Sequence, residues 1–350
     1  MTARWTWHTL RFKRPAGTSR GTLHTKDSAF IQVCTDDGRT AIGECGLLRG
    51  LSCDDRPGYA AQLDAVCDGI DEALNAPEEW ADWPSIRFAL EMLARDLQTP
   101  MPFHYHDSAW ARGEAGIPTN GLVWMGDADF MARQMDEKLA QGFGCIKMKI
   151  GAIDLETELR LLRGLRDRFP ADVLELRVDA NGAFAPDEAP AILDRLAALD
   201  LHSIEQPVRP EFVDALARLS AESPLPVALD ESLIGLHDPA RRRDLLHAVR
   251  PAYIVLKPSL VGGWAASRDW IEAANEVGAG WWITSALESN VGLNAIAQFT
   301  ATFQDLMPQG LGTGSLYENN LPAPLVIRDA GLHRTPGPWD LSHIQRLLGW

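Results

Sequence analysis

The 350-residue sequence has no run of about 18 apolar residues, so we expect no helix that spans a membrane. The segment Met1–Leu10 is polar and rich in tryptophan, and it lacks the apolar core of a secretory signal. Positive charge is also scarce, because 33 Lys and Arg residues face 48 Asp and Glu residues and give a net charge of −15. Without a basic patch, neither nucleic acid nor an anionic membrane surface is an expected partner. These absences predict an acidic cytoplasmic protein.

Cysteine is sparse as well. The chain has five cysteines, an odd number, and no two of them follow the C-x-x-C pattern. This disfavours a disulfide framework and a structural zinc site, and it predicts reduced thiols. A chain of this length with 46% hydrophobic residues can bury a large core, and we expect two domains or one large barrel with an addition.

Lysine is rare, and its placement is informative. Only six of the 33 basic residues are lysines, namely Lys13, Lys26, Lys138, Lys147, Lys149 and Lys257. Lys147 and Lys149 lie in the apolar run Cys-Ile-Lys-Met-Lys-Ile, and Lys257 lies in Tyr-Ile-Val-Leu-Lys-Pro. A lysine with apolar neighbours at a strand end can have a lowered pKa, which makes it a candidate base.

Residues 1–112 predict an α+β domain. An Asp-Gly turn signal joins two short apolar strands, Phe30–Cys34 and Thr40–Glu44. A stretch with helical spacing follows at 59–97 and is interrupted by prolines.

From about residue 113, short apolar runs alternate with amphipathic helical segments. This alternation predicts a parallel sheet whose strands are covered on both faces. The runs expected to be strands are Cys145–Ile150, Val173–Val178, His202–Ile204, Pro226–Leu229, Ala252–Leu256 and Trp281–Ile283.

A polar residue stands at the carboxyl end of each run. These residues are Lys149, Asp179, Glu205, Asp230, Lys257 and Ser285, at spacings of 30, 26, 25, 27 and 28 residues. An eight-unit barrel of about 250 residues has about 31 per unit and carries its active site at that rim. A doubly wound sheet has similar local elements, but its ligands gather at a switch point rather than around a ring. The ring therefore favours a barrel.

The acids and lysines of this ring predict metal-assisted proton abstraction. Asp179, Glu205 and Asp230 would repel one another without a counter-ion, and an all-carboxylate set suits Mg²⁺, with Mn²⁺ as a substitute. No histidine accompanies them, which argues against zinc and non-haem iron. Lys149 and Lys257 flank the acids on opposite sides. In this layout a metal stabilises an enediolate while a lysine removes the proton next to a carboxylate.

Five motifs resemble the enolase superfamily and, within it, the muconate-lactonizing-enzyme subgroup. In chain order they are Lys147-Met148-Lys149, Val178-Asp179-Ala180-Asn181-Gly182, Ile204-Glu205-Gln206-Pro207, Leu229-Asp230-Glu231-Ser232 and Leu256-Lys257-Pro258. The resemblance implies an α/β fold, in which an α+β capping domain lies over a modified (β/α)7β barrel. We expect the capping domain at 1–112, with the C-terminal tail 322–350 returning to it, and the barrel at 113–321.

The resemblance also implies roles for individual residues. It places Mg²⁺ on Asp179, Glu205 and Asp230, and it makes Lys149, Lys257 and Lys147 the catalytic lysines. It implies a small-molecule carboxylate as substrate, and substrate contacts from Ser285, Leu287, Gly312 and Asn181. It further places two glycine-bearing stretches predicted as loops, Pro15–His24 and Gly46–Asp55, over the barrel mouth. The sequence leaves open whether the chain forms a homo-oligomer.

Within the subgroup, the chain most resembles the o-succinylbenzoate synthase family. The segment Thr284–Ser289 resembles its seventh strand, and Gly312–Gly314 with Tyr317–Asn320 resembles one of its branches. Dipeptide epimerases commonly carry Asp-x-Asp after the eighth strand, whereas Leu311–Ser315 contains no acid. The resemblance implies Mg²⁺-dependent dehydration of the cyclohexadiene SHCHC, which has a ring carboxylate, a hydroxyl and a succinyl chain, in menaquinone biosynthesis.

Other functions stay open at this stage. An N-acylamino acid racemase or a muconate cycloisomerase would use the same lysines and acids. A catalytically silent barrel is disfavoured, because all five charged residues of the ring are present. A Schiff-base aldolase using Lys257 or Lys149 would leave the three carboxylates without a role.

Overall fold

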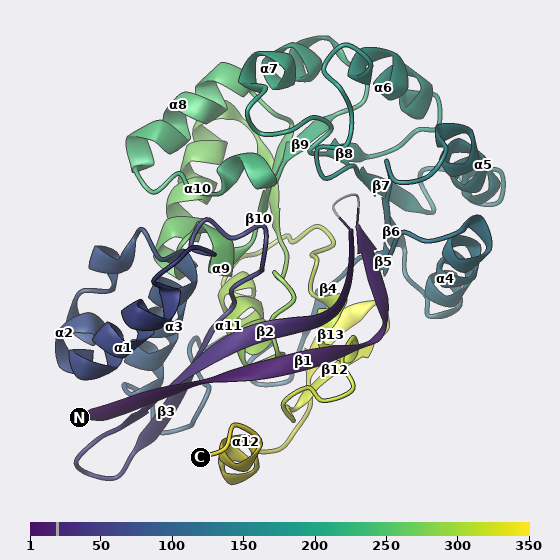
Figure 1. The fold of residues 1–350 in the computed structure, drawn as a ribbon. Coiled ribbons are helices and arrows are strands. Elements are labelled where there is room, and N and C mark those ends of the chain that lie inside the picture. Colours follow the sequence, from purple (N-terminus) through teal and green to yellow (C-terminus); the bar gives the residue numbers. More distant parts are fainter. Residues whose placement is uncertain (19–20) are drawn as a thin grey trace.

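The N-terminal part of the chain forms an antiparallel sheet. The computed structural model describes residues 1–18 and 21–350 (Figure 1). The sheet has the order β1-β2-β3, with β1 at Thr2–Thr18, β2 at Gly21–Cys34 and β3 at Thr40–Cys45. The hairpin predicted around the Asp-Gly turn is confirmed, because Cys34 pairs with Thr40 and Phe30 with Glu44.

The expectation of a loop at Pro15–His24 is wrong for the described residues. Residues 15–18 belong to β1 and residues 21–24 to β2, while residues 19 and 20 of that expectation lie outside the described residues. The strand continues because its glycine permits a close backbone approach. Gly17 forms a bridge with Met125, whose carbonyl group would collide with any Cβ at position 17.

Helices cover one face of this sheet. They are α1 (Tyr59–Asp68), α2 (Ile70–Asn75), the 3-10 helix η1 (Pro77–Trp80) and α3 (Pro84–Asp96). Pro77 and Pro84 each stand at the start of a helix, where the missing N–H costs no helical hydrogen bond. Leu63 of α1 and Leu90 of α3 are fully buried in the apolar core between these helices and the sheet.

The middle of the chain forms a parallel sheet with the order β11-β10-β9-β8-β7-β6-β5. Its strands are β5 (Gly121–Val123), β6 (Cys145–Lys149), β7 (Glu175–Asp179), β8 (Ser203–Glu205), β9 (Val227–Leu229), β10 (Tyr253–Leu256) and β11 (Gly280–Ile283). Parallel bridges join Gln309 to Thr119 and Gly310 to Thr284, so residues 309–310 connect the two edges of the sheet. The predicted barrel is thus confirmed, with its eighth position filled by a short bridging segment rather than a full strand.

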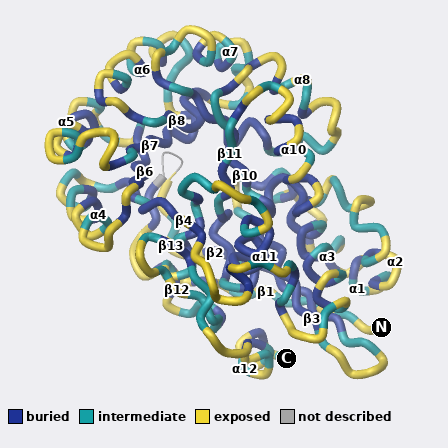
Figure 2. Tube along the Cα trace, turned by 180° about the vertical axis from the view of Figure 1, so that it is seen from behind, coloured by how far each residue is buried: buried dark blue, intermediate teal, exposed yellow. Residues whose placement is uncertain are grey.

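Helices surround this sheet on its outer side (Figure 1). They are α4 (Ala128–Ala140), α5 (Leu155–Arg166), α6 (Ala189–Ala197), α7 (Val213–Glu222), α8 (Pro239–Val249), α10 (Gly263–Val277) and α11 (Asn290–Thr300). Three short helices instead follow the carboxyl ends of strands or of the bridging segment, namely η2 (Glu231–Leu233), α9 (Pro258–Val261) and η3 (Gly312–Ser315). Figure 2 shows that the barrel strands are buried and that the exposed residues gather on the outer sides of the helices.

The C-terminal tail adds a third sheet with the order β12-β13-β4. Its strands are β12 (Leu325–Arg328), β13 (Gly331–Arg334) and β4 (Gly116–Pro118), and the last helix is α12 (Leu341–Leu347). The tail contacts residues on both sides of position 112, because Trp110 donates a hydrogen bond to the carbonyl of Leu332 and Ile117 pairs with Leu332. The proposed boundaries at 112 and 321 stay predictions.

No helix among the described residues is long and apolar enough to cross a membrane.

Candidate active site

The residues predicted at the strand ends lie side by side along one edge of the parallel sheet. Strand register pairs Lys149 with Asp179 and Asp179 with Glu205. Asp230 directly follows β9, and Lys257 directly follows β10. The structure therefore brings these five residues together in the predicted order, because neighbouring parallel strands end at the same rim.

The lysines pair with the acids in the interior. Lys147 Nζ lies 2.5 Å from Glu205 Oε2 and 3.0 Å from Asp179 Oδ2. Lys149 Nζ donates hydrogen bonds to Asp179 Oδ2 and to Asn181 Oδ1, both at 2.8 Å. Lys257 pairs with Asp230. The side chains of all three lysines and all three acids are nearly or fully buried.

Burial and pairing set the ionisation of this cluster. Burial alone would raise the pKa of Asp179, but the charges of Lys147 and Lys149 outweigh it and hold that pKa well below its usual value. Burial, followed by the charge of Asp179, raises the pKa of Glu205. Burial would lower the pKa of Lys147 and of Lys257, but carboxylate charges reverse the direction and raise both. The expectation that apolar surroundings lower the pKa is therefore wrong for Lys147 and Lys257, because their ammonium groups face acids rather than apolar side chains.

The three acids suit a hard divalent cation in their chemistry. Asp179, Glu205 and Asp230 supply only carboxylate oxygens, and Glu205 Oε1 is buried without a hydrogen-bond partner among the described residues. The ammonium group of Lys147 contacts both Asp179 and Glu205. No three Asp, Glu, His or Cys side chains of the described residues are arranged as a metal site. The ligand set therefore stays a prediction that the donor atoms support.

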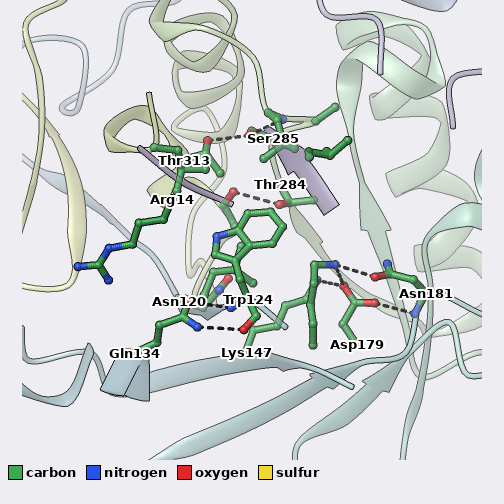
Figure 3. A pocket seen from close by; sticks show the side chains of 18 of the residues that line it. Arg14, Asn120, Trp124, Gln134, Lys147, Asp179, Asn181, Thr284, Ser285 and Thr313 are labelled. Atoms are coloured by element: carbon green, nitrogen blue, oxygen red, sulfur yellow. Dashed lines mark hydrogen bonds and ion pairs between the residues drawn. The ribbon is translucent and has the colours of Figure 1, made fainter. Parts of the chain in front are cut away.

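A cavity of about 550 Å³ opens beside this cluster (Figure 3). Its lining includes the three lysines and Asp179, whereas Glu205 and Asp230 are not part of it. All four residues predicted to contact substrate, Asn181, Ser285, Leu287 and Gly312, line the cavity.

The segment after β11 is held in place by its own polar contacts. Ser285 Oγ lies 2.7 Å from Thr313 Oγ1 and accepts a hydrogen bond from the Leu287 N–H at 3.0 Å. The Tyr317 hydroxyl donates to the Leu287 carbonyl at 2.7 Å. Leu287 has a φ of 64°, a left-handed conformation that needs such support in a non-glycine residue.

Trp124 and Gln134 are site residues that the sequence interpretation missed. The Trp124 ring lies 5.9 Å from Lys149 Nζ and forms part of the cavity wall (Figure 3). Gln134 accepts a hydrogen bond from the Trp124 N–H at 3.0 Å and donates one to its carbonyl at 2.9 Å, and so fixes that residue. The missed signal was spacing, because Trp124 stands 25 residues before Lys149 and continues the same repeat.

The capping sheet forms the other wall of the cavity. Lys13 and Arg14 of β1, Leu23 of β2 and residues 48–51 line it. The placement of both glycine-bearing stretches near the barrel mouth is in accord with this, although the described residues of the first stretch belong to β1 and β2 rather than to a loop.

A buried polar cluster joins the capping sheet to the barrel. We call it the interface cluster, and it consists of Lys26, Glu44, Ser259, Glu288 and Ser289. Glu44 of β3 accepts hydrogen bonds from the Ser289 N–H, the Ser289 hydroxyl and the Gly292 N–H at 2.8, 2.5 and 2.9 Å. Ser259 Oγ donates to Glu288 Oε1 at 2.5 Å. Lys26 Nζ donates to Ser28 Oγ at 2.8 Å, and its charge acts on both Glu44 and Glu288. This cluster fastens the start of α11 to the capping sheet.

Known proteins resemble the chain in sequence. The family model described as "Enolase C-terminal domain-like" matches residues 130–338. The o-succinylbenzoate synthase of Desulfotalea psychrophila is 47% identical over 92% of this chain and 96% of that protein. The L-Ala-D/L-Glu epimerase of Bacillus subtilis is 23% identical over 84% of this chain and 82% of its own length.

Solved structures show the same architecture. The crystal structure of MenC from Desulfotalea psychrophila has a TM-score of 0.84 and 42% identity, and the match covers 95% of this chain and 99% of that one. The muconate lactonizing enzyme of Pseudomonas fluorescens has a TM-score of 0.81 over 99% of this chain and 98% of that one, and at 20% identity it shows the fold alone. The fold class predicted from the five motifs is confirmed.

Proposed function

The chain belongs to the enolase superfamily, and from this premise we propose that it acts as an o-succinylbenzoate synthase, a hydro-lyase of menaquinone biosynthesis. Its substrate is then SHCHC, which loses water to become o-succinylbenzoate. One observation carries the proposal most directly. Lys149 and Lys257 stand at the ends of β6 and β10, on either side of three buried acids, in a chain 47% identical to a synthase.

Members of the superfamily depend on a divalent metal, and we propose Mg²⁺ here, with Mn²⁺ as a substitute. Asp179, Glu205 and Asp230 would hold it. When bound, the ion supplies positive charge that stabilises a substrate carboxylate while negative charge develops on it.

The lysines of the chain perform the proton chemistry in this proposal. Lys149 takes the proton from the ring carbon next to the carboxylate, and Asp179 and Asn181 orient its Nζ through their hydrogen bonds. Lys257, on the other side of the acids, stabilises the negative charge that develops. Lys147 contacts both Asp179 and Glu205 and holds these two acids in place. The abstracted proton and the ring hydroxyl then leave as water, and the ring becomes aromatic.

The capping sheet excludes water from this chemistry in the proposal. Leu23 and Leu48 from the N-terminal part of the chain and Trp124 from the barrel bring apolar surface to the cavity. A dry cavity strengthens the interaction of Lys257 with the developing charge, because the local dielectric constant is low.

Two other reactions would use the same residues. An N-acylamino acid racemase and a muconate cycloisomerase also need two lysines and three acids at these positions. The 47% identity to a synthase favours the dehydration over racemisation and over cycloisomerisation. Relatives below 25% identity show only the fold. A cytoplasmic location, the absence of nucleic acid and membrane partners, and the oligomeric state stay predictions.

The proposal is tested by following the ultraviolet absorbance of SHCHC with the purified chain. We expect turnover in Mg²⁺, its loss in EDTA and its return when Mg²⁺ is added back in excess. Turnover that resists EDTA would contradict the proposed metal role. If SHCHC is not consumed in the presence of Mg²⁺, the synthase assignment is wrong, and α-proton exchange of N-acylamino acids in D₂O would then test the racemase.

The same assay separates the remaining mechanisms. If the chain were a Schiff-base aldolase, borohydride added with substrate would trap the covalent adduct and inactivate it. We expect borohydride to leave the activity unchanged. A catalytically silent barrel would neither consume SHCHC nor exchange any α-proton.

A further inference from the structure

One buried glutamine connects the three strand ends that carry the acids. Gln206 directly follows Glu205, the last residue of β8, and it is fully buried. Its hydrogen-bond partners include the segments that follow β7 and β9, which carry Asp179 and Asp230. The proposed mechanism uses the acids and the lysines but gives no role to this glutamine.

The backbone of Gln206 is bonded on both sides. Its N–H donates to the carbonyl of Ala228 in β9 at 2.8 Å, and its carbonyl accepts the N–H of Gly182 at 2.7 Å. Gly182 stands three residues after Asp179. The main chain of Gln206 therefore joins the segment after β7 to the neighbouring strand β9.

The side chain of Gln206 holds the segment that begins at Asp230. Its Oε1 accepts the N–H of Asp230 at 3.1 Å and the N–H of Ser232 at 3.2 Å. Its Nε2 donates to the Ser232 hydroxyl at 2.8 Å and to the Val208 carbonyl at 2.9 Å. An amide has two hydrogens to donate and two lone pairs to accept with, so all its hydrogen-bonding capacity is used.

Gln206 also has an uncommon backbone conformation. Its φ is 40°, in the left-handed region that non-glycine residues seldom adopt. Such a conformation costs free energy and persists only where surrounding contacts impose it, which occurs most often at functional sites. The strained residue stands where the three segments that carry acids meet.

The acids need support from outside their own side chains. Asp179, Glu205 and Asp230 repel one another when ionised. Asp230 belongs to neither β9 nor η2 but stands between them, and its N–H is held by Gln206. Groups that orient metal ligands contribute strongly to binding, and the loss of one typically weakens metal affinity by about 10–100-fold.

We propose that Gln206 is a positioning residue, which keeps Asp230 at the distance from Asp179 and Glu205 that binding of Mg²⁺ requires. The inference rests on the metal role in the proposed function. Gln206 is not among the described residues that line the cavity, and its amide has no free hydrogen-bonding atom. It therefore acts through the acids and not on the substrate.

The test measures the affinity for Mg²⁺ by isothermal titration calorimetry without substrate. Gln206→Met keeps the length of the side chain and removes its acceptor and its donors. The Kd for Mg²⁺ should rise by about 10–100-fold. An unchanged Kd in this variant would overturn the inference.

Gln298→Met is the matched control, because Gln298 makes the same set of bonds in another part of the barrel. Its Oε1 accepts the N–H groups of Tyr105 and His106 at 2.7 and 3.0 Å. Its Nε2 donates to the Phe103 carbonyl at 2.6 Å and to Asn294 Oδ1 at 3.1 Å. Both variants should lose stability in urea, but Gln298→Met should bind Mg²⁺ as the wild type does. An equal loss of Mg²⁺ affinity in both would show a general effect of the fold and overturn the inference.

Turnover gives an independent measurement. In Gln206→Met, the Mg²⁺ concentration for half-maximal turnover of SHCHC should rise by the same factor as Kd, and the rate should recover at saturating Mg²⁺. A purely structural role would lower the unfolding midpoint and leave the Mg²⁺ requirement unchanged, which would contradict the inference.

Ser232→Ala is a milder variant that disturbs the fold less. It removes only the hydroxyl that accepts from Gln206 Nε2, and the two N–H groups bonded to Oε1 remain. The loss of one hydrogen bond should raise the Kd for Mg²⁺ by about two- to tenfold. If Gln206→Met does not fold, this variant decides the question, and an unchanged Kd would refute the role of Gln206.

The outcome is separable from that of the proposed function. Binding of Mg²⁺ needs no substrate, so a wild type that binds Mg²⁺ but does not consume SHCHC would refute the synthase and leave the role of Gln206 testable. A wild type that consumes SHCHC and binds Mg²⁺ no better than Gln206→Met would refute the role of Gln206 alone. A wild type that binds no Mg²⁺ would overturn this inference together with the metal role.

Discussion

Replacing Glu44 by glutamine should destabilise the fold by more than the loss of one surface charge can explain. Glu44 is fully buried, and its two carboxylate oxygens accept the N–H groups of Ser289 and Gly292 and the hydroxyl of Ser289. These N–H groups are at the start of α11, where no carbonyl of the helix can accept them.

The magnitude follows from the shape of the amide. A glutamine has one acceptor oxygen, so in either orientation its NH₂ group faces one backbone N–H, of Ser289 or of Gly292. That buried N–H loses its partner, which costs about 1–3 kcal/mol. The charge at a partly buried helix N-terminus contributes up to about 2 kcal/mol more. Lys26 also loses one of the three carboxylates that act on it. We expect a loss of about 2–4 kcal/mol in the free energy of unfolding.

The assay is equilibrium unfolding in urea, followed by circular dichroism and tryptophan fluorescence. Asp238→Asn is the matched control, since Asp238 caps the N-terminus of α8 from an exposed position and asparagine caps equally well. The control should lose no more than about 0.5 kcal/mol. If Glu44→Gln is no less stable than Asp238→Asn, the interface cluster does not fasten the capping sheet to the barrel.

Three further predictions concern other parts of the molecule. Lys149→Met should lower kcat on SHCHC by about 10²–10⁴-fold with an unchanged circular dichroism spectrum, and activity within tenfold of the wild type would remove Lys149 as the base. Burial raises the pKa of Glu91 from 4.5 to about 7, so the folded state binds this proton more tightly than the unfolded chain and stability falls as pH rises through that window. Glu91→Gln should flatten this fall by an amount on the order of 2 kcal/mol, and thermal melts that lose the same Tm between pH 5 and pH 8 in both proteins would contradict it. Gly310→Ala places a Cβ against the side chain of Thr284 where the barrel closes, and urea unfolding should show a loss of about 1–3 kcal/mol.

The positions of the polar residues at the strand ends could be predicted from the sequence, because they recur once in each βα unit. Each βα unit of a barrel brings its strand to the same rim, so the spacing from Lys149 to Asp179 and on to Glu205 encodes spatial neighbours. The register of β6, β7 and β8 places these residues opposite one another. The prediction needed only the period of the pattern and the apolar character of each run.

The contacts between the capping sheet and the barrel follow no such rule. Glu44 and Ser289 are 245 residues apart in sequence, and nothing periodic links them. The glycines near position 17 illustrate the same difficulty. They resembled a loop, but Gly17 lies in a strand whose backbone approaches Met125 of the barrel. Where two distant segments approach closely, the sequence shows the glycine that permits the approach. It does not show which segment that glycine contacts.

The ionisation of the lysines was mispredicted for a related reason. The sequence shows the apolar neighbours of Lys147 and Lys257 along their strands, but those neighbours point away from the site. The groups that determine each pKa come from the next strands, Glu205 and Asp179 for Lys147 and Asp230 for Lys257.

The scarcity of lysine can be explained by comparing the contacts that lysine and arginine side chains make in the structure. Arginine makes fixed contacts, as where Arg166 donates to the carbonyls of Leu199, Phe169, Leu174 and Asp200. Its fork of donors suits a permanent partner, and it does not release its proton. A base has to release a proton, which favours lysine over arginine. The chain places three of its six lysines, Lys147, Lys149 and Lys257, at or near the ends of β6 and β10 beside the cavity.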